Sequence, residues 1–381
     1  MTQPSSRKLL LAAAASVTLL ASAECALRLC GFKFAPRDIP ITIWNPDEDE
    51  LLDGTESLHD SDPHSLWVPR PHAHIPWTKE ERVNARGYRG PELELRTEPT
   101  PFRVAFLGDS STFGWMVTED QSFPQRTAAA LELEGVHAES LNAGVIGYSI
   151  AQGLARYREL VRAYRPDAVV LGFGAVNDHL NGPGQGSDRS KIQKLEASDH
   201  WLGRAKAWCR STLRVAHFVS WLRYQRMGGE PAIRKRLREA KRLDLTDLKE
   251  VGKASYNGTR RVSVSEYSDL LDELVNAIKL DGSQAILLSM PRKLSAEERS
   301  PVLLEYSTAT MIAGERLGVR TLDIRALLRS YNDLYDTERG EPADLALFFD
   351  HWHPRPRGHQ LIADALKPHL LSIARESGHD R

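Results

Sequence analysis

Five short apolar runs that alternate with helical stretches constrain the fold of this chain more than any other feature. Strands that alternate with helices form right-handed βαβ units, and such strands lie parallel in one sheet. The alternation predicts an α/β fold with a three-layer, flavodoxin-like parallel sheet of about five strands. The expected strands are 104–107, 136–141, 168–173, 284–290 and 319–324. The expected helices are 123–133, 150–163, 266–280, 295–317 and 360–373, and the helix 295–317 is kinked or divided at Pro301.

Each of the first three expected strands is followed by a loop of glycine and polar residues, at 108–114, 142–149 and 174–179. The carboxyl ends of parallel strands meet at one edge of the sheet, where ligands bind in open α/β folds, so these loops are expected to converge. The first loop opens with Gly-Asp-Ser, a tripeptide that also occurs in ordinary turns. At a sheet edge its serine hydroxyl is placed as a nucleophile requires, and Ser110 is the candidate.

An Asp and a His three residues apart, Asp350 and His353, occupy a loop near the end of the chain. A histidine that takes a proton from a serine needs one neutral ring nitrogen facing the hydroxyl and a carboxylate fixing the other. The spacing predicts that Asp350 orients His353 and that His353 activates Ser110. A zinc site is the alternative, because carboxylate and imidazole groups both ligate zinc. Its ligands would be Asp350, His351, His353 and His359. No second cluster completes a metal site of known spacing, so we expect no metal and no cofactor.

These motifs, taken in order, resemble the four sequence blocks of the SGNH, or GDSL-type, hydrolase superfamily. The resemblance extends over about 102–371. Residues 108–110 match the first block and 142–147 the second, while 177–178 and 350–353 match the third and fourth. The resemblance thus covers most of the chain and agrees with the expected parallel sheet.

The resemblance implies a role for each matching residue. Ser110 would be the nucleophile, His353 the base and Asp350 the acid of a catalytic triad. The backbone N–H groups of Ser110 and Gly147 and the side-chain amide of Asn177 would form the oxyanion hole.

One position departs from the family pattern. The third block usually has a glycine two residues before the asparagine, but Ala175 stands there and Gly174 lies one residue further back. We expect the Asn177 amide to reach the site nevertheless, because alanine is small. Asp109 is expected to support the loop rather than to serve as the triad acid.

Members of the superfamily act as esterases, lipases, carbohydrate deacetylases or O-acyltransferases. The expectation is an extracytoplasmic serine esterase or deacetylase that hydrolyses a short-chain or carbohydrate O-acyl ester, with an acylated small molecule or glycan as substrate. The alternatives are an O-acyltransferase that modifies an envelope or secreted polysaccharide, with polysaccharide-assembly proteins as partners, and a non-catalytic glycan-binding scaffold. The segments 84–90 and 24–29 further resemble those of a membrane-anchored bacterial subgroup.

The N-terminal segment has the features of an export signal. Arg7 and Lys8 precede an uncharged apolar run, 9–23, which ends in the small-x-small pattern of a signal-peptidase site. Residues 1–32 are therefore expected to form a signal peptide or a membrane anchor. The basic pair would stay in the cytoplasm, and the rest of the chain would lie on the periplasmic side or be secreted. The alternative is an amphipathic or buried helix of a cytosolic protein.

Three further regions follow this segment: an extended arm or cap (33–100), the hydrolase domain (101–376) and a helical insertion within it (181–262). The arm is rich in Pro, Asp, Glu and His, and the irregular spacing of its histidines favours solvated side chains over metal ligands. These histidines are His64, His72 and His74. The insertion is rich in Arg and Lys and is expected to pack as helices with a solvated cationic face. It could alternatively cover the site as a lid, or bind anionic glycan or lipid.

Composition excludes two further classes. The 381 residues carry a formal net charge of −1, which gives no support for a protein that binds nucleic acid over its whole surface. The three cysteines are too few for a disulfide framework. They are Cys25, Cys30 and Cys209.

Overall fold

The structure, a computed structural model, divides the chain into two compact units. One unit comprises residues 1–39 and 196–240, and the other comprises 40–195 and 241–381. The residues described are 6–32, 34, 58–96, 101–179, 186–198, 208–209, 212–226, 228, 260–299, 301–339 and 347–379.

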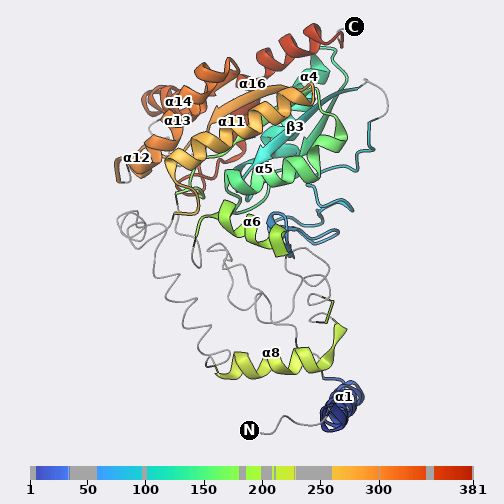
Figure 1. Cartoon of the computed structure of the whole chain (residues 1–381). Helices are drawn as coiled ribbons and strands as arrows, with labels where there is room; N and C mark the ends of the chain where they lie inside the picture. Colours follow the sequence, from blue (N-terminus) through green and yellow to red (C-terminus); the bar gives the residue numbers. More distant parts are fainter. Residues whose placement is uncertain are drawn as a thin grey trace. The chain divides into compact units, whose positions relative to one another are not determined.

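The larger unit is built on a five-stranded sheet in which all neighbouring strands run parallel (Figure 1). The strand order is β4-β3-β5-β6-β7, so the first strand of this sheet lies between the second and the third. This is the flavodoxin-like order, and the predicted fold class is confirmed. The strands are β3 (Phe102–Gly108), β4 (Ala138–Asn142), β5 (Ala168–Gly172), β6 (Gln284–Ser289) and β7 (Arg320–Asp323).

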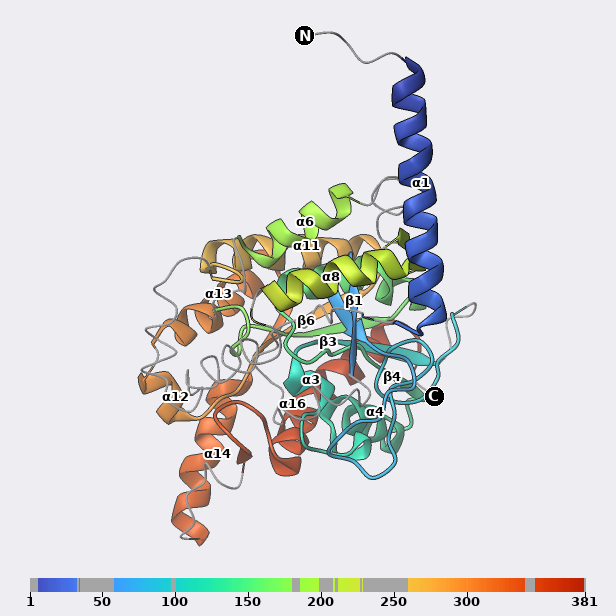
Figure 2. The ribbon, with the colours of Figure 1, turned by 90° about the horizontal axis from the view of Figure 1, so that it is seen from below.

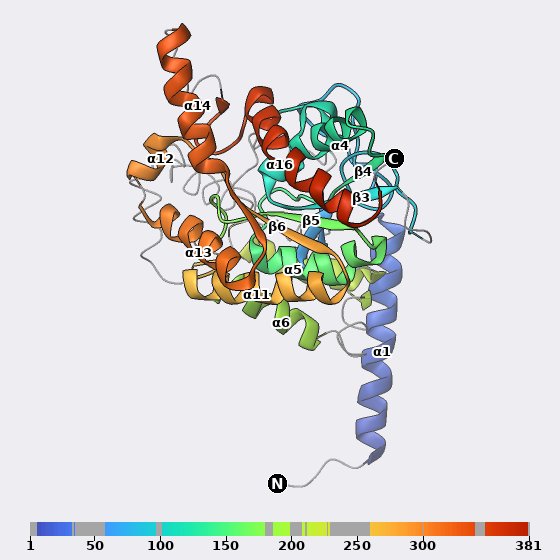
Figure 3. The same ribbon diagram turned by 90° about the horizontal axis from the view of Figure 1, so that it is seen from above.

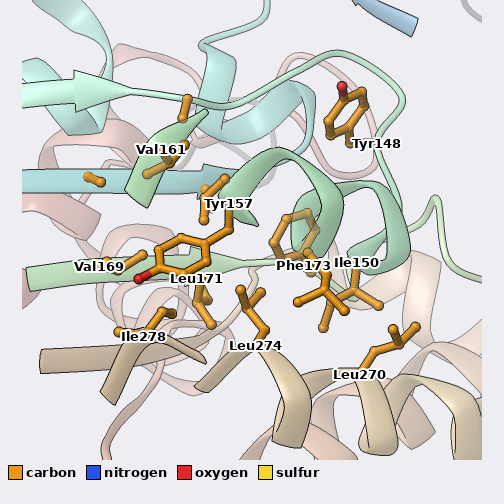
Figure 4. Packing of buried hydrophobic residues seen from close by; sticks show 14 of the residues in the cluster. Tyr148, Ile150, Tyr157, Val161, Val169, Leu171, Phe173, Leu270, Leu274 and Ile278 are labelled. Atoms are coloured by element: carbon orange, nitrogen blue, oxygen red, sulfur yellow. The ribbon is translucent and has the colours of Figure 1, made fainter. Parts of the chain in front are cut away.

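Helices cover both faces of this sheet, as Figure 3 shows. Successive side chains of a strand point to opposite faces, so Ala105 and Leu107 of β3 join one apolar cluster while Val104 and Phe106 join the other. The first cluster includes α5 (Ile150–Glu159), α11 (Val264–Leu280) and α13 (Val302–Leu317), and part of it is drawn in Figure 4. The second includes α4 (Phe123–Leu133), α14 (Ile324–Arg339) and α16 (Pro356–Glu376). Burial on both faces explains why these strands read as continuous apolar runs.

One helical prediction is confirmed, and one helix was not predicted. The expected helix 295–317 is divided at Pro301, which separates α12 (Leu294–Arg299) from α13. This division was expected, because proline lacks the N–H that a helix interior needs. The helix α14 after the last strand was not predicted, although its buried Ile324 and Leu328 have helical spacing.

The described part of the expected arm, 58–96, belongs to the larger unit and packs against it. It opens with an antiparallel hairpin of β1 (His59–Asp62) and β2 (Leu66–Pro69). Trp67 and Tyr88 are buried in the same apolar cluster as α5, and an isolated bridge joins Arg89 to Asn142 at the end of β4. The arm thus reaches the carboxyl edge of the sheet. Residues 35–57 and 97–100 of the arm lie outside the described residues.

In the smaller unit, α1 (Ser6–Leu29) packs against α8 (Arg214–Arg226) (Figure 2). The Glu24 carboxylate accepts hydrogen bonds from the N–H groups of Arg214 and Val215, at 3.0 and 2.9 Å, where α8 begins. A carboxylate is favourable there because the first N–H groups of a helix have no partner within it. None of the described helices is long and apolar enough to cross a membrane. Much of the expected basic insertion, including 229–259, lies outside the described residues.

Candidate active site

The candidate nucleophile begins a short helix at the carboxyl end of β3. Ser110 is the first residue of α3 (Ser110–Phe113), and Asp109 caps this helix by accepting the Ser111 N–H at 2.9 Å. The strand must end in glycine, because a Cβ at Gly108 would lie 2.0 Å from Thr112 Oγ1. The turn therefore holds Ser110 at the sheet edge, as the sequence predicted.

The structure joins the three candidate catalytic side chains by hydrogen bonds. Ser110 Oγ lies 2.8 Å from His353 Nε2, and His353 Nδ1 lies 2.6 Å from Asp350 Oδ2. The other oxygen of Asp350 accepts the N–H groups of Trp352 and His353 at 3.0 and 2.9 Å. The ring of Trp115 stacks on the His353 imidazole, with centroids 5.5 Å apart. The histidine is thus held from two sides, with Nε2 directed at the serine.

Asp350 is arranged to remain ionised. Burial raises the pKa of its carboxyl, but the hydrogen bonds and charge of His353 and the two backbone N–H groups lower it, and the net pKa lies below the usual value of an aspartate. An ionised carboxylate accepts a hydrogen bond from the Nδ1–H of His353. The proton of the neutral ring is then on Nδ1 and the lone pair is on Nε2, which faces Ser110.

The four candidate zinc ligands do not form one cluster. His359 Nδ1 accepts the Phe123 N–H at 3.1 Å, and its ring stacks on the Phe123 ring. Burial lowers the pKa of His359 to about 3, so it is a neutral core histidine. In the part of the chain that the structure describes, no three His, Cys, Asp or Glu side chains are grouped so that they could hold a metal ion.

The candidate oxyanion donors lie on the first three loops. Asn177 is buried, and its Nδ2 donates to Asp109 Oδ2 at 3.1 Å, which leaves a second hydrogen of the amide available. Asp109 therefore supports two loops, while His353 takes Asp350 as its carboxylate partner. Within the described residues, the backbone N–H groups of Ser110 and Gly147 donate no hydrogen bond.

The third loop accommodates alanine at position 175. Gly174 has a φ of 80°, a left-handed conformation that glycine adopts at low cost, and Ala175 is buried. Asp178 ties this loop to α5 by accepting the N–H groups of Gly174 and Ile150 at 3.0 and 2.8 Å. Burial raises the pKa of Asp178 to about 7. The Asn177 amide lies beside the nucleophile turn, because it donates to Asp109, the residue before Ser110; its role as an oxyanion donor stays a prediction.

Three buried arginines hold the site loops by their backbone carbonyls, and the sequence analysis did not single them out. Arg89 donates to carbonyls at and just after the end of α3, Arg261 to the second loop and Arg292 to the third. The carbonyls are those of Phe113, Gly114 and Val117 for Arg89, Gly147 for Arg261, and Gly174 and Ala175 for Arg292. An isolated arginine in a loop gives no periodic signal, and although residues 84–90 resemble a segment of the membrane-anchored subgroup, no contact of Arg89 was predicted.

Comparison with known proteins decides the family. The model of the GDSL-like lipase/acylhydrolase family matches residues 106–361, which include every candidate site residue. The chain belongs to this family. The predicted SGNH/GDSL-type identity is therefore confirmed, and the chain is a member of a family of ester-hydrolysing enzymes. The membrane-anchored subgroup and the residue roles remain predictions.

The individual proteins that this chain resembles are named as esterases or hydrolases. An arylesterase from Vibrio mimicus is 32% identical over 80 residues, which are 21% of this chain, and the match spans 40% of that relative. Two solved structures, both 18% identical, are an α/β hydrolase from the metagenome of Lake Arreo and an acetylxylan esterase from Geobacillus stearothermophilus. The match to the Lake Arreo hydrolase has a TM-score of 0.43 and covers 71% of this chain and 95% of the hydrolase. The match to the acetylxylan esterase has a TM-score of 0.41 and covers 73% of this chain and 96% of the esterase.

Proposed function

We propose that this GDSL-family chain is a serine esterase or deacetylase that hydrolyses an acyl ester through Ser110, His353 and Asp350. The observation that carries the proposal is the continuous hydrogen-bonded relay, 2.8 Å from Ser110 to His353 and 2.6 Å from His353 to Asp350. The relay joins Ser110 to an Asp-His pair whose histidine lies 243 residues further along the chain, at the edge of the sheet where ligands bind.

The reaction follows from the order of the contacts from Ser110 through His353 to Asp350. Ser110 Oγ attacks the ester carbonyl carbon while His353 Nε2 takes the hydroxyl proton. When the tetrahedral intermediate collapses, the bond to the alcohol breaks and His353 returns the proton to the leaving oxygen. Water then attacks the acyl-serine, gives its proton to His353, and the acid leaves as Ser110 regains its hydrogen. Asp350 stabilises the imidazolium in each half of the cycle.

The oxyanion of each tetrahedral intermediate would be bound by three donors, the N–H groups of Ser110 and Gly147 and the free amide hydrogen of Asn177. These donors are fixed before the substrate arrives, so no reorganisation is needed when the charge develops. The loss of one donor typically costs about 100-fold to 1,000-fold in kcat.

For the substrate we propose a short-chain or carbohydrate O-acyl ester. The partly exposed Trp115 ring stands beside His353, which protonates the leaving alcohol, so an aryl or sugar ring can pack there. The arylesterase relative agrees with an ester of this type. Turnover of 4-nitrophenyl acetate and of acetylated oligosaccharides, with and without added sugar, tests the substrate class. Release of 4-nitrophenol that depends on a sugar acceptor, with formation of an acetylated sugar, would instead indicate an O-acyltransferase.

We propose an extracytoplasmic location from the N-terminal segment. The pair Arg7 and Lys8 before the apolar run 9–23 supports export or anchoring. Cell fractionation, with the N-terminal residue identified by mass spectrometry, tests this proposal. Recovery of the intact chain in the soluble cytoplasmic fraction would contradict it.

The proposed nucleophile is tested by labelling the full chain with a fluorophosphonate probe and measuring the intact mass. One adduct is expected on the unmutated protein and none on Ser110→Ala or His353→Ala. The matched control is Ser111→Ala, which removes the neighbouring buried hydroxyl, bonded to the Trp352 carbonyl at 3.3 Å, and should still be labelled. An adduct on Ser110→Ala, or no adduct on the folded unmutated protein, would refute the assignment.

A further inference from the structure

The indole of Trp67 holds the back of one peptide group in the second loop. Trp67 lies on β2 in the arm, is 8% exposed, and donates its Nε1–H to the Ile146 carbonyl oxygen at 3.1 Å. In a trans peptide the C=O of one residue and the N–H of the next point in opposite directions from the same rigid plane. The group that Trp67 holds is therefore the one whose other side is the Gly147 N–H.

Arg261 holds the following peptide group. Its Nη1 donates to the Gly147 carbonyl at 2.7 Å, and its guanidinium lies 5.5 Å from the centre of the Trp67 ring. The guanidinium is itself fixed, because Nε donates to Asp188 at 2.8 Å and Nη2 donates to Gln152 at 2.6 Å. Two consecutive carbonyls of the loop are thus bound by two buried donors that contact each other.

This loop needs such support at Gly147. Gly147 has a φ of 78°, a left-handed conformation that glycine adopts at low cost. Glycine also adopts many other backbone conformations, so it does not by itself hold the loop in this one. The loop is joined to the nucleophile turn by the Val145 N–H, which donates to the Gly108 carbonyl at 3.1 Å. Rotation of the Ile146–Gly147 peptide would break the Trp67 bond, so the indole fixes the direction of the Gly147 N–H.

We propose that Trp67 is a positioning residue for the oxyanion hole and that Arg261 braces it, an inference that rests on the proposed esterase function. A hydrogen bond to a carbonyl polarises its amide and strengthens the N–H on the other side. Both effects act on the Gly147 N–H, and the oxyanion that this N–H would bind exists only in the tetrahedral intermediate. Loss of the indole N–H lowers kcat and leaves KM nearly unchanged.

The test compares Trp67→Phe with Trp77→Phe in the full chain. Trp77 is a matched control, because it is also in the arm and its Nε1–H also donates to a loop carbonyl, that of Val117 at 3.0 Å. That peptide carries none of the proposed donors. Trp67→Phe is expected to lower kcat for 4-nitrophenyl acetate by about 10-fold to 100-fold, a fraction of the loss on deleting a whole donor. Trp77→Phe should lower it by less than about threefold.

A second variant separates the hydrogen bond from the volume of the ring. Trp67 replaced by 3-benzothienylalanine keeps the shape of the indole and lacks its N–H, so it should reproduce the kcat loss with an unchanged unfolding midpoint. Wild-type kcat in this variant, or an equal loss in Trp77→Phe, overturns the inference while the esterase function stands. A folded unmutated protein that neither reacts with the fluorophosphonate nor turns over an ester overturns both.

Discussion

The substitution Asp350→Asn tests the relay at the atom that sets the histidine tautomer. The two oxygens of Asp350 have separate partners: one accepts two backbone N–H groups, and the other faces His353 Nδ1 at 2.6 Å. Asparagine can keep its carbonyl on the backbone groups, and its NH₂ group then faces Nδ1. The imidazole must accept that hydrogen bond and carry its own proton on Nε2, against Ser110. The loop survives, but the base has no lone pair for the serine proton.

The size of the effect follows from this geometry. In a serine protease with the same relay, the equivalent change lowers kcat by about 10⁴-fold. The Asp350 side chain is 34% exposed, and solvent that reaches it weakens its control of the tautomer. We therefore expect a loss of about 10³-fold to 10⁴-fold, which is roughly 4 to 5.5 kcal/mol of transition-state stabilisation at 1.36 kcal/mol per tenfold.

The assay measures kcat and KM with 4-nitrophenyl acetate and the unfolding midpoint of each variant. Asp350→Asn should keep KM and the midpoint near the wild-type values. Asp350→Ala is the control, since it also removes the acceptor of two backbone N–H groups, and it should cost about 1 to 3 kcal/mol of stability besides the activity. The reasoning fails if folded Asp350→Asn keeps more than a tenth of wild-type kcat.

Two further predictions concern packing and pH. In Gly144→Ala the new Cβ would lie 2.5 Å from the Phe113 backbone nitrogen, so α3 must shift; we expect at least a 10-fold loss of kcat and a lower unfolding midpoint, and wild-type values of both would contradict this. Burial lowers the pKa of His359 from 6.5 to about 3. Between about pH 3 and pH 6.5 the unfolded chain therefore binds more protons at this residue than the folded chain does. The contribution of His359 to the free energy of unfolding thus falls as the pH falls below 6.5. His359→Asn keeps an acceptor for the Phe123 N–H but does not titrate, so its free energy of unfolding should depend less on pH below 6.5, by up to about 1.4 kcal/mol per pH unit. Equal slopes for the two proteins in urea unfolding at pH 5 and 6 would contradict this assignment.

Local patterns predicted the sheet and the contacts of the candidate relay. Burial on both faces makes β3 and β5 continuous apolar runs, and a parallel sheet then places the loops after them at one edge. The positions of Ser110 and His353 could be predicted because each lies in a motif at the end of an element. The helix α14 was not predicted, although its buried Ile324 and Leu328 have helical spacing.

The support of the site could not be read in the same way. Trp67 and Arg261 lie 79 and 114 residues from the carbonyls that they bind. A contact at this separation leaves no trace in local periodicity, and a single arginine in a loop is more often a solvated charge. Only the folded chain shows that these side chains are buried beside the second loop.

Asp188 and Arg261, at the two ends of the segment 189–260, are joined to each other through both backbone and side chain. The Asp188 N–H donates to the Arg261 carbonyl at 2.8 Å, and the side chains of the same two residues form an ion pair at 2.8 Å. The entropy of a loop with closed ends depends only logarithmically on its length, so each doubling costs about 0.6 kcal/mol. Lengthening the chain between these two residues should therefore change the folding free energy of the sheet little. The Asp188–Arg261 pair therefore marks a place where natural variation or engineering can change the length of the insertion without rebuilding the sheet.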